Sequence, residues 1–353
     1  MRGVVFLGNR ELELREFPDP VPGPRDVVIE IKASGMCGTD LHLYRHSGEG
    51  PAIAGMNASE PSIGGHEPCG VVVEVGSAVR ETEAFVGQRV MDHHYEGCGV
   101  CRHCRSGWGQ MCVDGATVFG ITGHGAHADY MRAPVGTLVP LREDLSFAVG
   151  AAISCGTGTA FGALRRLELH GDETIAVFGQ GPVGLSASLL AQAMGARVIA
   201  VDVQAERCEF ARTFGVDEVI NASEVDPVKA IKELTRGEGA HKTLDCTSSA
   251  AARQAAVRST RDWGTACMVG VGGDKLELDV ARDLIFRQVG VIGSWTFSTT
   301  GQADCANFVA ERKLPVEKLF TDRWKLEDAA EAYRKFDKEA TGKGVFLLDT
   351  PAH

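Results

Sequence analysis

The middle of the chain, from residue 173 to about 293, alternates short apolar runs with amphipathic stretches. Thr174–Phe178 is expected to form a strand. From Pro182 to Met194, apolar residues return on one face every three to four positions, which predicts a helix that ends before Gly195. Such alternation predicts a doubly wound parallel sheet of the α/β class. The other elements expected here are the strands Val198–Val201, Lys242–Asp245, Ala266–Gly270 and Val289–Gly293 and the helix Glu206–Phe214.

The two ends of the chain show a different pattern. In the first 155 residues, short β-like runs are separated by turns rich in glycine and proline, which predicts a mostly β domain. These runs are Val27–Lys32, Val71–Val75 and Gln88–Met91. The tail after residue 295 is expected to pack back onto that domain. Its predicted elements are the helices Gln302–Arg312 and Leu326–Asp337 and the strand Gly344–Leu348. The predicted organisation is therefore 1–155, 156–294 and 295–353.

Length and charge narrow the class of protein. A chain of 353 residues exceeds the size of a single core, so two domains are expected. The net charge of −11 disfavours binding to nucleic acid or to anionic membranes. The apolar stretch Val4–Leu7 is too short for a signal peptide, and no run reaches the length of a membrane span. We therefore expect a cytoplasmic protein.

A glycine motif, G-x-G-x-x-G, joins the first predicted strand to the first predicted helix of the middle domain. This context favours a dinucleotide site over a chance match, although the same turn could serve another α/β domain. Gly179 permits the tight turn, Gly181 lets the backbone approach a pyrophosphate, and Gly184 lets helix and strand pack closely. The helix N-terminus, with Pro182 and Val183, presents free N–H groups to the phosphates.

The residues after the next strand indicate which dinucleotide binds. Asp202 lies 18 residues after Gly184 and could accept hydrogen bonds from the adenosine ribose. Its charge would repel the extra phosphate of NADP, and Val203 rather than an arginine follows, so NAD is favoured. Arg207 lies one helical turn further on and could reach the ribose or a phosphate. Two more residues are assigned to this site, Val269 and Val271.

Four cysteines form a C-x2-C-x2-C-x7-C pattern within residues 93–113: Cys98, Cys101, Cys104 and Cys112. In a reducing compartment, clustered cysteines indicate metal binding rather than disulfides. Four thiolates close a tetrahedral zinc shell, so such a zinc would be structural. An iron–sulfur cluster is the alternative, because this short spacing also suits clusters.

Three further segments each contain one zinc-type ligand: Cys37, His66 and Cys155. Two sulfurs and one nitrogen would leave a fourth position for water or an alcohol, as in a catalytic zinc site. The pair His66-Glu67 lacks the second histidine of the metalloprotease motif, so that class is excluded.

Taken together, these motifs resemble the zinc-containing medium-chain dehydrogenase/reductase family, the alcohol and polyol dehydrogenase group. The segment GHEPCGVVVEVGSAV, residues 65–79, fits the family's zinc signature, and the other motifs follow in the family's order. The resemblance covers nearly the whole chain and favours zinc over an iron–sulfur cluster. It implies a GroES-like catalytic domain, a Rossmann NAD-binding domain, and two Zn²⁺ ions, one catalytic and one structural.

The resemblance also assigns roles to single residues. Cys37, His66 and Cys155 match the catalytic zinc ligands, and Glu67 matches an acid beside the zinc that binds it transiently. Asp40 matches the carboxylate that orients the zinc-bound histidine.

Further matches concern the proton and the cofactor. Thr39 matches the hydroxyl that takes the substrate proton, and His42 matches the end of the relay to solvent. Thr159 matches a residue near the nicotinamide ring.

Substrate and assembly are less specified. His94 and Trp295 are assigned to the substrate pocket, and a polar wall at His94 favours a polyol, sugar, cyclitol or amino alcohol. Cys155 points the other way, because polyol and threonine dehydrogenases often carry an acid near that place. Alternatives are an aldehyde or ketone reductase and a catalytically silent NAD-binding zinc protein. The short connection from Cys112 to Cys155 resembles tetrameric bacterial members, so a homotetramer is expected, with a homodimer as the alternative.

Overall fold

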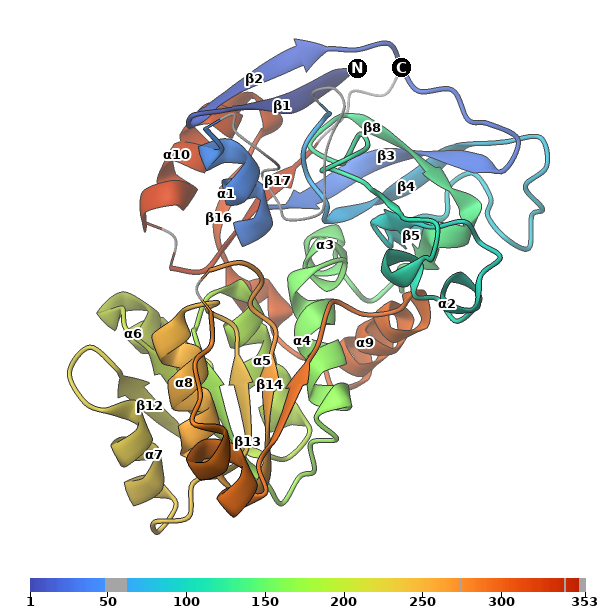
Figure 1. Cartoon of the computed structure of the whole chain (residues 1–353). Helices are drawn as coiled ribbons and strands as arrows, with labels where there is room; N and C mark the ends of the chain where they lie inside the picture. Colours follow the sequence, from blue (N-terminus) through green and yellow to red (C-terminus); the bar gives the residue numbers. More distant parts are fainter. Residues whose placement is uncertain (48–61, 274, 340, 349–353) are drawn as a thin grey trace. The chain divides into compact units, whose positions relative to one another are not determined.

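The computed structural model describes residues 1–47, 62–273, 275–339 and 341–348. The chain forms two compact units, each described here by itself (Figure 1). The first unit contains Met1–Gly158 together with Phe297–His353, and the second contains Thr159–Thr296.

The second unit is built on a six-stranded sheet in the order β12-β11-β10-β13-β14-β15. Every neighbouring pair is parallel. The chain starts in the middle and adds strands outward on both sides, which is the doubly wound Rossmann topology. The strands are β10 (Thr174–Phe178), β11 (Arg197–Asp202), β12 (Glu218–Asn221), β13 (Ala240–Asp245), β14 (Thr260–Met268) and β15 (Gly290–Gly293). The predicted fold class is confirmed.

Helices connect these strands and bury their faces. All five residues of β10 are buried, as expected for a central strand covered on both sides. A core around Phe178, Ile199 and Ile220 joins strands to the helix residue Ile231. The helices are α5 (Pro182–Ala193), α6 (Ala205–Arg212), α7 (Pro227–Leu234) and α8 (Ala250–Ser259), with shorter helical turns at Val280–Leu284 and Ile285–Arg287.

The first unit contains a seven-stranded sheet in the order β16-β17-β3-β4-β5-β9, with β8 also paired to β3. The tail strand β17 pairs antiparallel with β3, Val345 opposite Gly35, so the two ends of the chain build one sheet. The strands are β3 (Asp26–Gly35), β4 (Pro68–Val75), β5 (Arg89–Asp92), β8 (Tyr130–Pro134), β9 (Leu138–Pro140), β16 (Phe320–Trp324) and β17 (Lys343–Leu347).

Smaller elements complete the first unit. Two-stranded sheets pair β1 (Arg2–Gly8) with β2 (Glu11–Glu16), and β6 (Tyr95–Glu96) with β7 (Thr117–Val118). The helices are α1 (Gly38–Arg45), α2 (Arg102–Arg105), α3 (Phe147–Ile153), α4 (Gly156–Arg166), which runs on into the second unit, α9 (Thr299–Glu311) and α10 (Ala329–Glu339). Turns of 3-10 helix lie at Gly109–Met111, Val135–Thr137, Val316–Leu319 and Leu326–Asp328.

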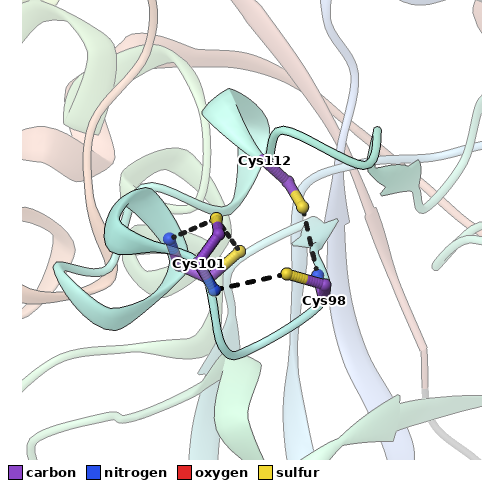
Figure 2. Close-up of side chains that lie close together, drawn as sticks. Cys98, Cys101 and Cys112 are labelled. Atoms are coloured by element: carbon purple, nitrogen blue, oxygen red, sulfur yellow. Dashed lines mark hydrogen bonds between the residues drawn. The ribbon is translucent and has the colours of Figure 1, made fainter.

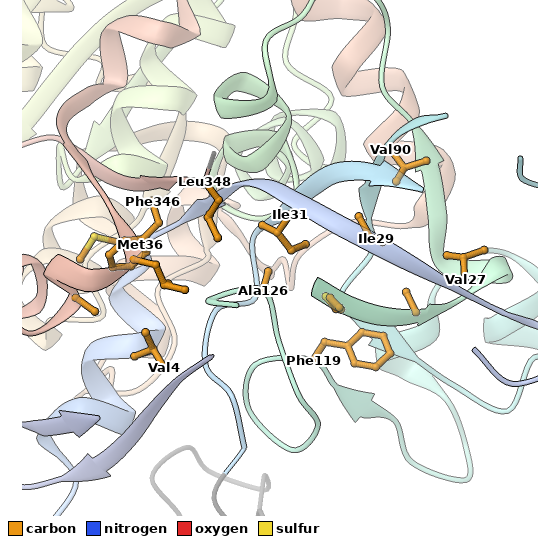
Figure 3. Packing of buried hydrophobic residues seen from close by; sticks show 14 of the residues in the cluster. Val4, Val27, Ile29, Ile31, Met36, Val90, Phe119, Ala126, Phe346 and Leu348 are labelled. Atoms are coloured by element: carbon orange, nitrogen blue, oxygen red, sulfur yellow. The ribbon is translucent and has the colours of Figure 1, made fainter. Parts of the chain in front are cut away.

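The core of the first unit fixes the strands that lead into the site. Val27, Ile29 and Ile31 project from β3 and pack in one cluster with Phe346 of β17 (Figure 3). Each such side chain contributes roughly 1.5–3 kcal/mol when it is fully buried. This packing anchors both strands, and β3 ends at Gly35, two residues before Cys37.

Among the described residues, no single helix is both long and apolar enough to cross a membrane. Only α3 and α4 taken together pass that test, and they are bent by 47° relative to each other.

Candidate functional site

Four potential metal ligands meet inside the first unit. One ligand atom each from Cys37, His66, Glu67 and Cys155 lies within 4.8 Å of all the others. Cys37 stands just before α1, His66 and Glu67 precede β4, and Cys155 lies between α3 and α4. The sulfurs of Cys37 and Cys155 are 3.9 Å apart. The structure therefore brings together three segments that the sequence keeps far apart.

His66 is held so that one ring nitrogen is left for a metal. Its Nδ1 lies 3.0 Å from Oδ1 of Asp40, to which it donates. Its Nε2 is buried and has no hydrogen-bond partner among the described residues. Asp40 is itself fixed, because its Oδ2 accepts the backbone N–H of Cys37 at 2.8 Å. A buried ring nitrogen without a partner, beside two cysteine sulfurs, fits a zinc ion that takes nitrogen and sulfur ligands.

The ligand groups of this cluster differ in how firmly they hold a proton. Burial lowers the pKa of His66, but Asp40 and Cys37 outweigh it and keep the pKa well above its usual range. The hydrogen bond from Cys155 keeps the pKa of Cys37 well below its usual range, while the same bond and burial raise that of Cys155. Metal binding would release the protons of His66 and Cys155, because zinc binds thiolate and neutral imidazole.

Glu67 is paired with a lysine that the sequence reading missed. Lys343 is buried and donates to Oε1 of Glu67 at 2.7 Å and to the carbonyl oxygen of Met36 at 3.0 Å. Burial raises the pKa of Glu67 to about 8, an effect that the lysine opposes. A Cβ on Gly35 would lie 1.8 Å from Oε2 of Glu67, so only glycine fits there. One feature of the sequence could have identified this lysine: it directly precedes the predicted strand Gly344–Leu348.

The two predicted proton-handling residues lie on α1. The hydroxyl of Thr39 is 3.7 Å from the sulfur of Cys37, so it belongs to the cluster. His42 stands one turn further along the helix and is exposed to solvent. The helix thus connects the buried cluster to a titratable side chain at the surface.

His94 lies beside the zinc-type histidine, with ring centroids 5.2 Å apart. It is buried, and its Nδ1 donates to the carbonyl oxygen of Ser154 at 3.1 Å. Burial, assisted by the charge of His66, keeps its pKa well below the usual range, so the ring is neutral. The second nitrogen, Nε2, is therefore a hydrogen-bond acceptor next to the cluster. Trp295, the other predicted pocket residue, lies in the second unit and is 40% exposed.

The four-cysteine lobe forms a second sulfur cluster (Figure 2). Its four sulfurs lie within 4.8 Å of one another. Backbone N–H groups within the lobe point at them, for example from Cys98 to the sulfur of Cys112 at 3.2 Å and from Cys101 to that of Cys98 at 3.4 Å. A Cβ on Gly97 would lie 2.5 Å from the sulfur of Cys104, so glycine permits the close approach. Four convergent sulfurs fit a closed tetrahedral metal site.

The glycine turn lies in the second unit between β10 and α5. Gly179 has a φ of +87°, which favours glycine. A Cβ on Gly184 would come within 1.7 Å of the carbonyl oxygen of Gly179, so helix and strand pack too closely for a side chain. A Cβ on Gly181 would lie 3.9 Å from the guanidinium of Arg207. Pro182 opens the helix, followed by Val183, as expected for an anion-binding N-terminus.

Asp202 ends β11 next to this turn. Its two carboxylate oxygens accept backbone N–H groups, from Gln180 at 2.6 Å and from Gln204 at 2.9 Å. These bonds fix the carboxylate at the carboxyl end of the sheet, where dinucleotides bind in this topology. The other assigned cofactor residues are Val269, which is buried, Val271, which is exposed, and Thr159, which is buried in α4.

Comparisons with known proteins agree with this arrangement. Residues 23–143 match the family model described as "Alcohol dehydrogenase GroES-like domain", and residues 182–312 match "Zinc-binding dehydrogenase". The chain is 39% identical to the uncharacterised zinc-type alcohol dehydrogenase-like protein YphC of Escherichia coli, over 98% of both chains. It is 30% identical to an L-threonine 3-dehydrogenase of Rhizobium etli, over 95% of this chain and 94% of that protein.

A solved structure shares the whole fold. The alcohol dehydrogenase TADH from Thermus sp. ATN1 is 27% identical, with a TM-score of 0.89 over 99% of this chain and 100% of that one. The family models cover Cys37, His66, Glu67 and the four lobe cysteines, and the alignment with YphC extends over nearly the whole chain. The chain belongs to the zinc-containing medium-chain dehydrogenase/reductase family and is a dehydrogenase of the zinc alcohol dehydrogenase group.

Proposed function

We propose that this enzyme oxidises a small polar alcohol, such as a polyol, sugar, cyclitol or amino alcohol. The observation that carries this proposal is the neutral, buried His94, whose ring lies 5.2 Å from that of His66. Its Nε2, which carries no proton, is an acceptor for which an aliphatic substrate offers no donor. A second hydroxyl or an amino group on the substrate would satisfy it, and sites built to hydrogen-bond a substrate reject analogues that lack the group.

In this proposal the catalytic zinc is held by Cys37, His66 and Cys155. When bound, the zinc would polarise the alcohol oxygen, and NAD would supply the hydride acceptor. Asp40 keeps the proton of His66 on Nδ1, so that Nε2 faces the metal position. The hydrogen bond from Lys343 restrains Glu67, so that in this proposal Glu67 is not a permanent ligand.

Thr39 is proposed to accept the substrate proton, since its hydroxyl lies 3.7 Å from a ligand sulfur. His42, exposed on the same helix, passes that proton to solvent. The opposite direction, reduction of an aldehyde or ketone, uses the same groups in reverse. The concentrations of the two substrates then decide which direction the enzyme runs in the cell.

The cofactor is proposed to lie over the turn of Gly179, Gly181 and Gly184, with its pyrophosphate at the start of α5. Asp202 would bind the adenosine ribose, and its charge opposes the extra phosphate of NADP. Arg207 lies close enough to the turn to contact a phosphate. The remaining predicted contacts, those of Thr159, Val269, Val271 and Trp295, belong to the same proposal.

The second zinc is proposed to be structural, held by the four sulfurs of the lobe. We also propose a homotetramer, because large apolar side chains stand exposed near β15, an edge strand of the second unit's sheet. These are Trp263, Ile285, Phe286 and Val291. A cytoplasmic location is proposed from the two sulfur clusters, since their thiols must stay reduced to bind metal.

The substrate proposal is tested by comparing a plain alcohol with a diol of the same carbon number and with a hydroxy amino acid. We would measure kcat/KM for 1-propanol, 1,2-propanediol and L-threonine with NAD and with NADP, from the absorbance of the reduced cofactor. We expect the polar substrates and NAD to be preferred. In His94→Phe the preference for the diol over 1-propanol should fall about 10-fold. A wild-type preference for 1-propanol would contradict the proposal.

A further inference from the structure

A buried line of hydrogen bonds extends beyond Asp40, away from the metal cluster. The hydroxyl of Tyr333 donates to Oδ2 of Asp40 at 3.1 Å. Nε2 of His127 lies 2.6 Å from that hydroxyl, and Nδ1 of His127 lies 2.7 Å from the hydroxyl of Ser34. The line therefore runs from His66 through a carboxylate, a phenol and an imidazole to a serine. Nothing in the roles assigned above uses its last three members.

Only one assignment of donors and acceptors satisfies every hydrogen bond in this line. An ionised Asp40 can only accept hydrogen bonds, so the single hydroxyl proton of Tyr333 is donated to the carboxylate. The Tyr333 oxygen must then accept, and the N–H at 2.6 Å is Nε2–H of His127. A neutral His127 with its proton on Nε2 has a bare Nδ1, which accepts from Ser34. Burial lowers the pKa of His127 to about 4, in agreement with the neutral ring.

The line ends inside the protein. Ser34, Asp40, His127 and Tyr333 are all fully buried. A proton passed along it would not reach water, so the line does not serve as an exit path like that of Thr39 and His42. Buried, satisfied networks instead fix the positions of their members. Asp40 then receives three donors: the N–H of Cys37, Nδ1–H of His66 and the Tyr333 hydroxyl.

We propose that Tyr333 and His127 are positioning residues for the catalytic zinc, acting through Asp40 on His66. Tyr333 holds the Asp40 carboxylate in the one orientation that points Nε2 of His66 at Cys37 and Cys155. His127 in turn keeps the Tyr333 hydroxyl turned toward Asp40. The inference rests on the proposed zinc ligands, and it assigns to α10, in the C-terminal segment, a part in metal retention.

The test measures how fast a colorimetric chelator removes zinc from the full-length, zinc-loaded enzyme. The release phase that is missing in Cys155→Ala identifies the catalytic zinc, and the other phase serves as an internal reference. In Tyr333→Phe the catalytic phase should be about 10-fold faster, in line with other partners of metal-bound histidines. The reference phase should not change.

Tyr44 gives a matched control. Its ring packs against that of Tyr333, with centroids 5.7 Å apart, and it is also buried. Within the described residues it is not a donor to Asp40, so Tyr44→Phe removes a hydroxyl from the same core without touching the line. Its catalytic release phase should match the wild type. Equal release rates in Tyr333→Phe and Tyr44→Phe would overturn the proposal.

Substitutions at His127 test the direction of the line. His127→Gln keeps a donor and an acceptor and should release zinc at nearly the wild-type rate, whereas His127→Phe should release it faster. Because His127 acts through Tyr333, the double variant Tyr333→Phe/His127→Phe should be no faster than Tyr333→Phe alone. Additive effects would contradict this. Thermal unfolding shows whether Tyr333→Phe folds. If it does not, the comparison of His127→Gln with His127→Phe tests the proposal instead.

Zinc content separates this inference from the proposed function. A wild-type enzyme that binds one zinc, at the four-cysteine lobe, would refute the proposed catalytic ligands. A wild-type enzyme with two zincs whose release is unaffected by Tyr333→Phe, by His127→Phe and by the double variant would refute only the role of Tyr333 and His127.

Discussion

The two sulfur clusters of this enzyme have similar ligands but opposite surroundings. In the lobe, four cysteines supply all the ligand atoms, and their supporting hydrogen bonds come from nearby backbone N–H groups. In the buried cluster, the ligands come from three distant segments and are supported by side chains such as Asp40 and Lys343. The lobe therefore needs only a short stretch of chain, whereas the buried cluster needs the whole first unit. This difference teaches that a cluster of neighbouring cysteines can form locally, while a cluster of ligands from distant segments must be held by the fold.

The largest expected effect separates the two clusters by their function. Cys155→Ala should lose one zinc and lower kcat/KM by roughly 10³-fold or more, because the metal contributes several kcal/mol of charge stabilisation. The lobe zinc should remain, as measured by metal analysis. Retention of two zincs with near-normal activity would show that Cys155 is not a ligand.

The support of the buried cluster can be weakened without removing a ligand. Asp40→Asn replaces an ionised acceptor with an amide, so His66 is oriented less firmly. Activity should fall about 10- to 100-fold, with faster loss of the catalytic zinc. Glu96→Gln serves as a control acid outside the cluster. If the Asp40→Asn enzyme had wild-type kinetics, the buried cluster would not depend on the hydrogen bond between Asp40 and His66.

Loss of the metal from the four-cysteine lobe should lower the thermal stability of the protein. Cys101→Ala should remove the structural zinc and lower Tm by about 5 °C or more, since metal binding stabilises the fold. Cys305→Ala, which changes a buried cysteine outside both clusters, gives the matched control. Thermal unfolding with and without a chelator measures both. If Cys101→Ala keeps its zinc and its Tm, the lobe is not a metal site.

The smallest effect concerns pH. The pKa of His94 lies well below its ordinary value, so the neutral ring persists at every pH above that lowered pKa. Between pH 6 and 9, His94→Gln should therefore leave the shape of the kcat/KM profile unshifted, although its height changes. A limb of the wild-type profile that disappears in His94→Gln would show that His94 gains a proton in this range.

Local sequence patterns were enough to predict much of the fold and of the candidate sites. The glycine turn, the four-cysteine spacing and the alternation of strands and helices are set by neighbours within a few residues. The doubly wound sheet was predicted correctly, although β12, α7 and α8 were not foreseen. α7 nevertheless carries a signal in the sequence, because Asp226 caps it, Pro227 opens it and its apolar residues lie on one face.

The supporting residues of the buried cluster could not be read in this way. Lys343 meets Glu67 across 276 residues, and Tyr333 meets Asp40 across 293. No local spacing reports such contacts, because they depend on β17 pairing with β3. The burial of His94 was also undecided in the sequence, where a surface position was equally consistent. Packing within the folded unit, and not propensity, decides these positions.

The pairing of β17 with β3 has a consequence for biosynthesis. The segment that supplies Tyr333 and Lys343 leaves the ribosome long after all four lobe cysteines. Since domains fold as units while the chain is made, the lobe can take up its metal while the catalytic cluster still lacks its supports. The buried cluster of a nascent chain therefore stays without Lys343 until β17 has paired with β3.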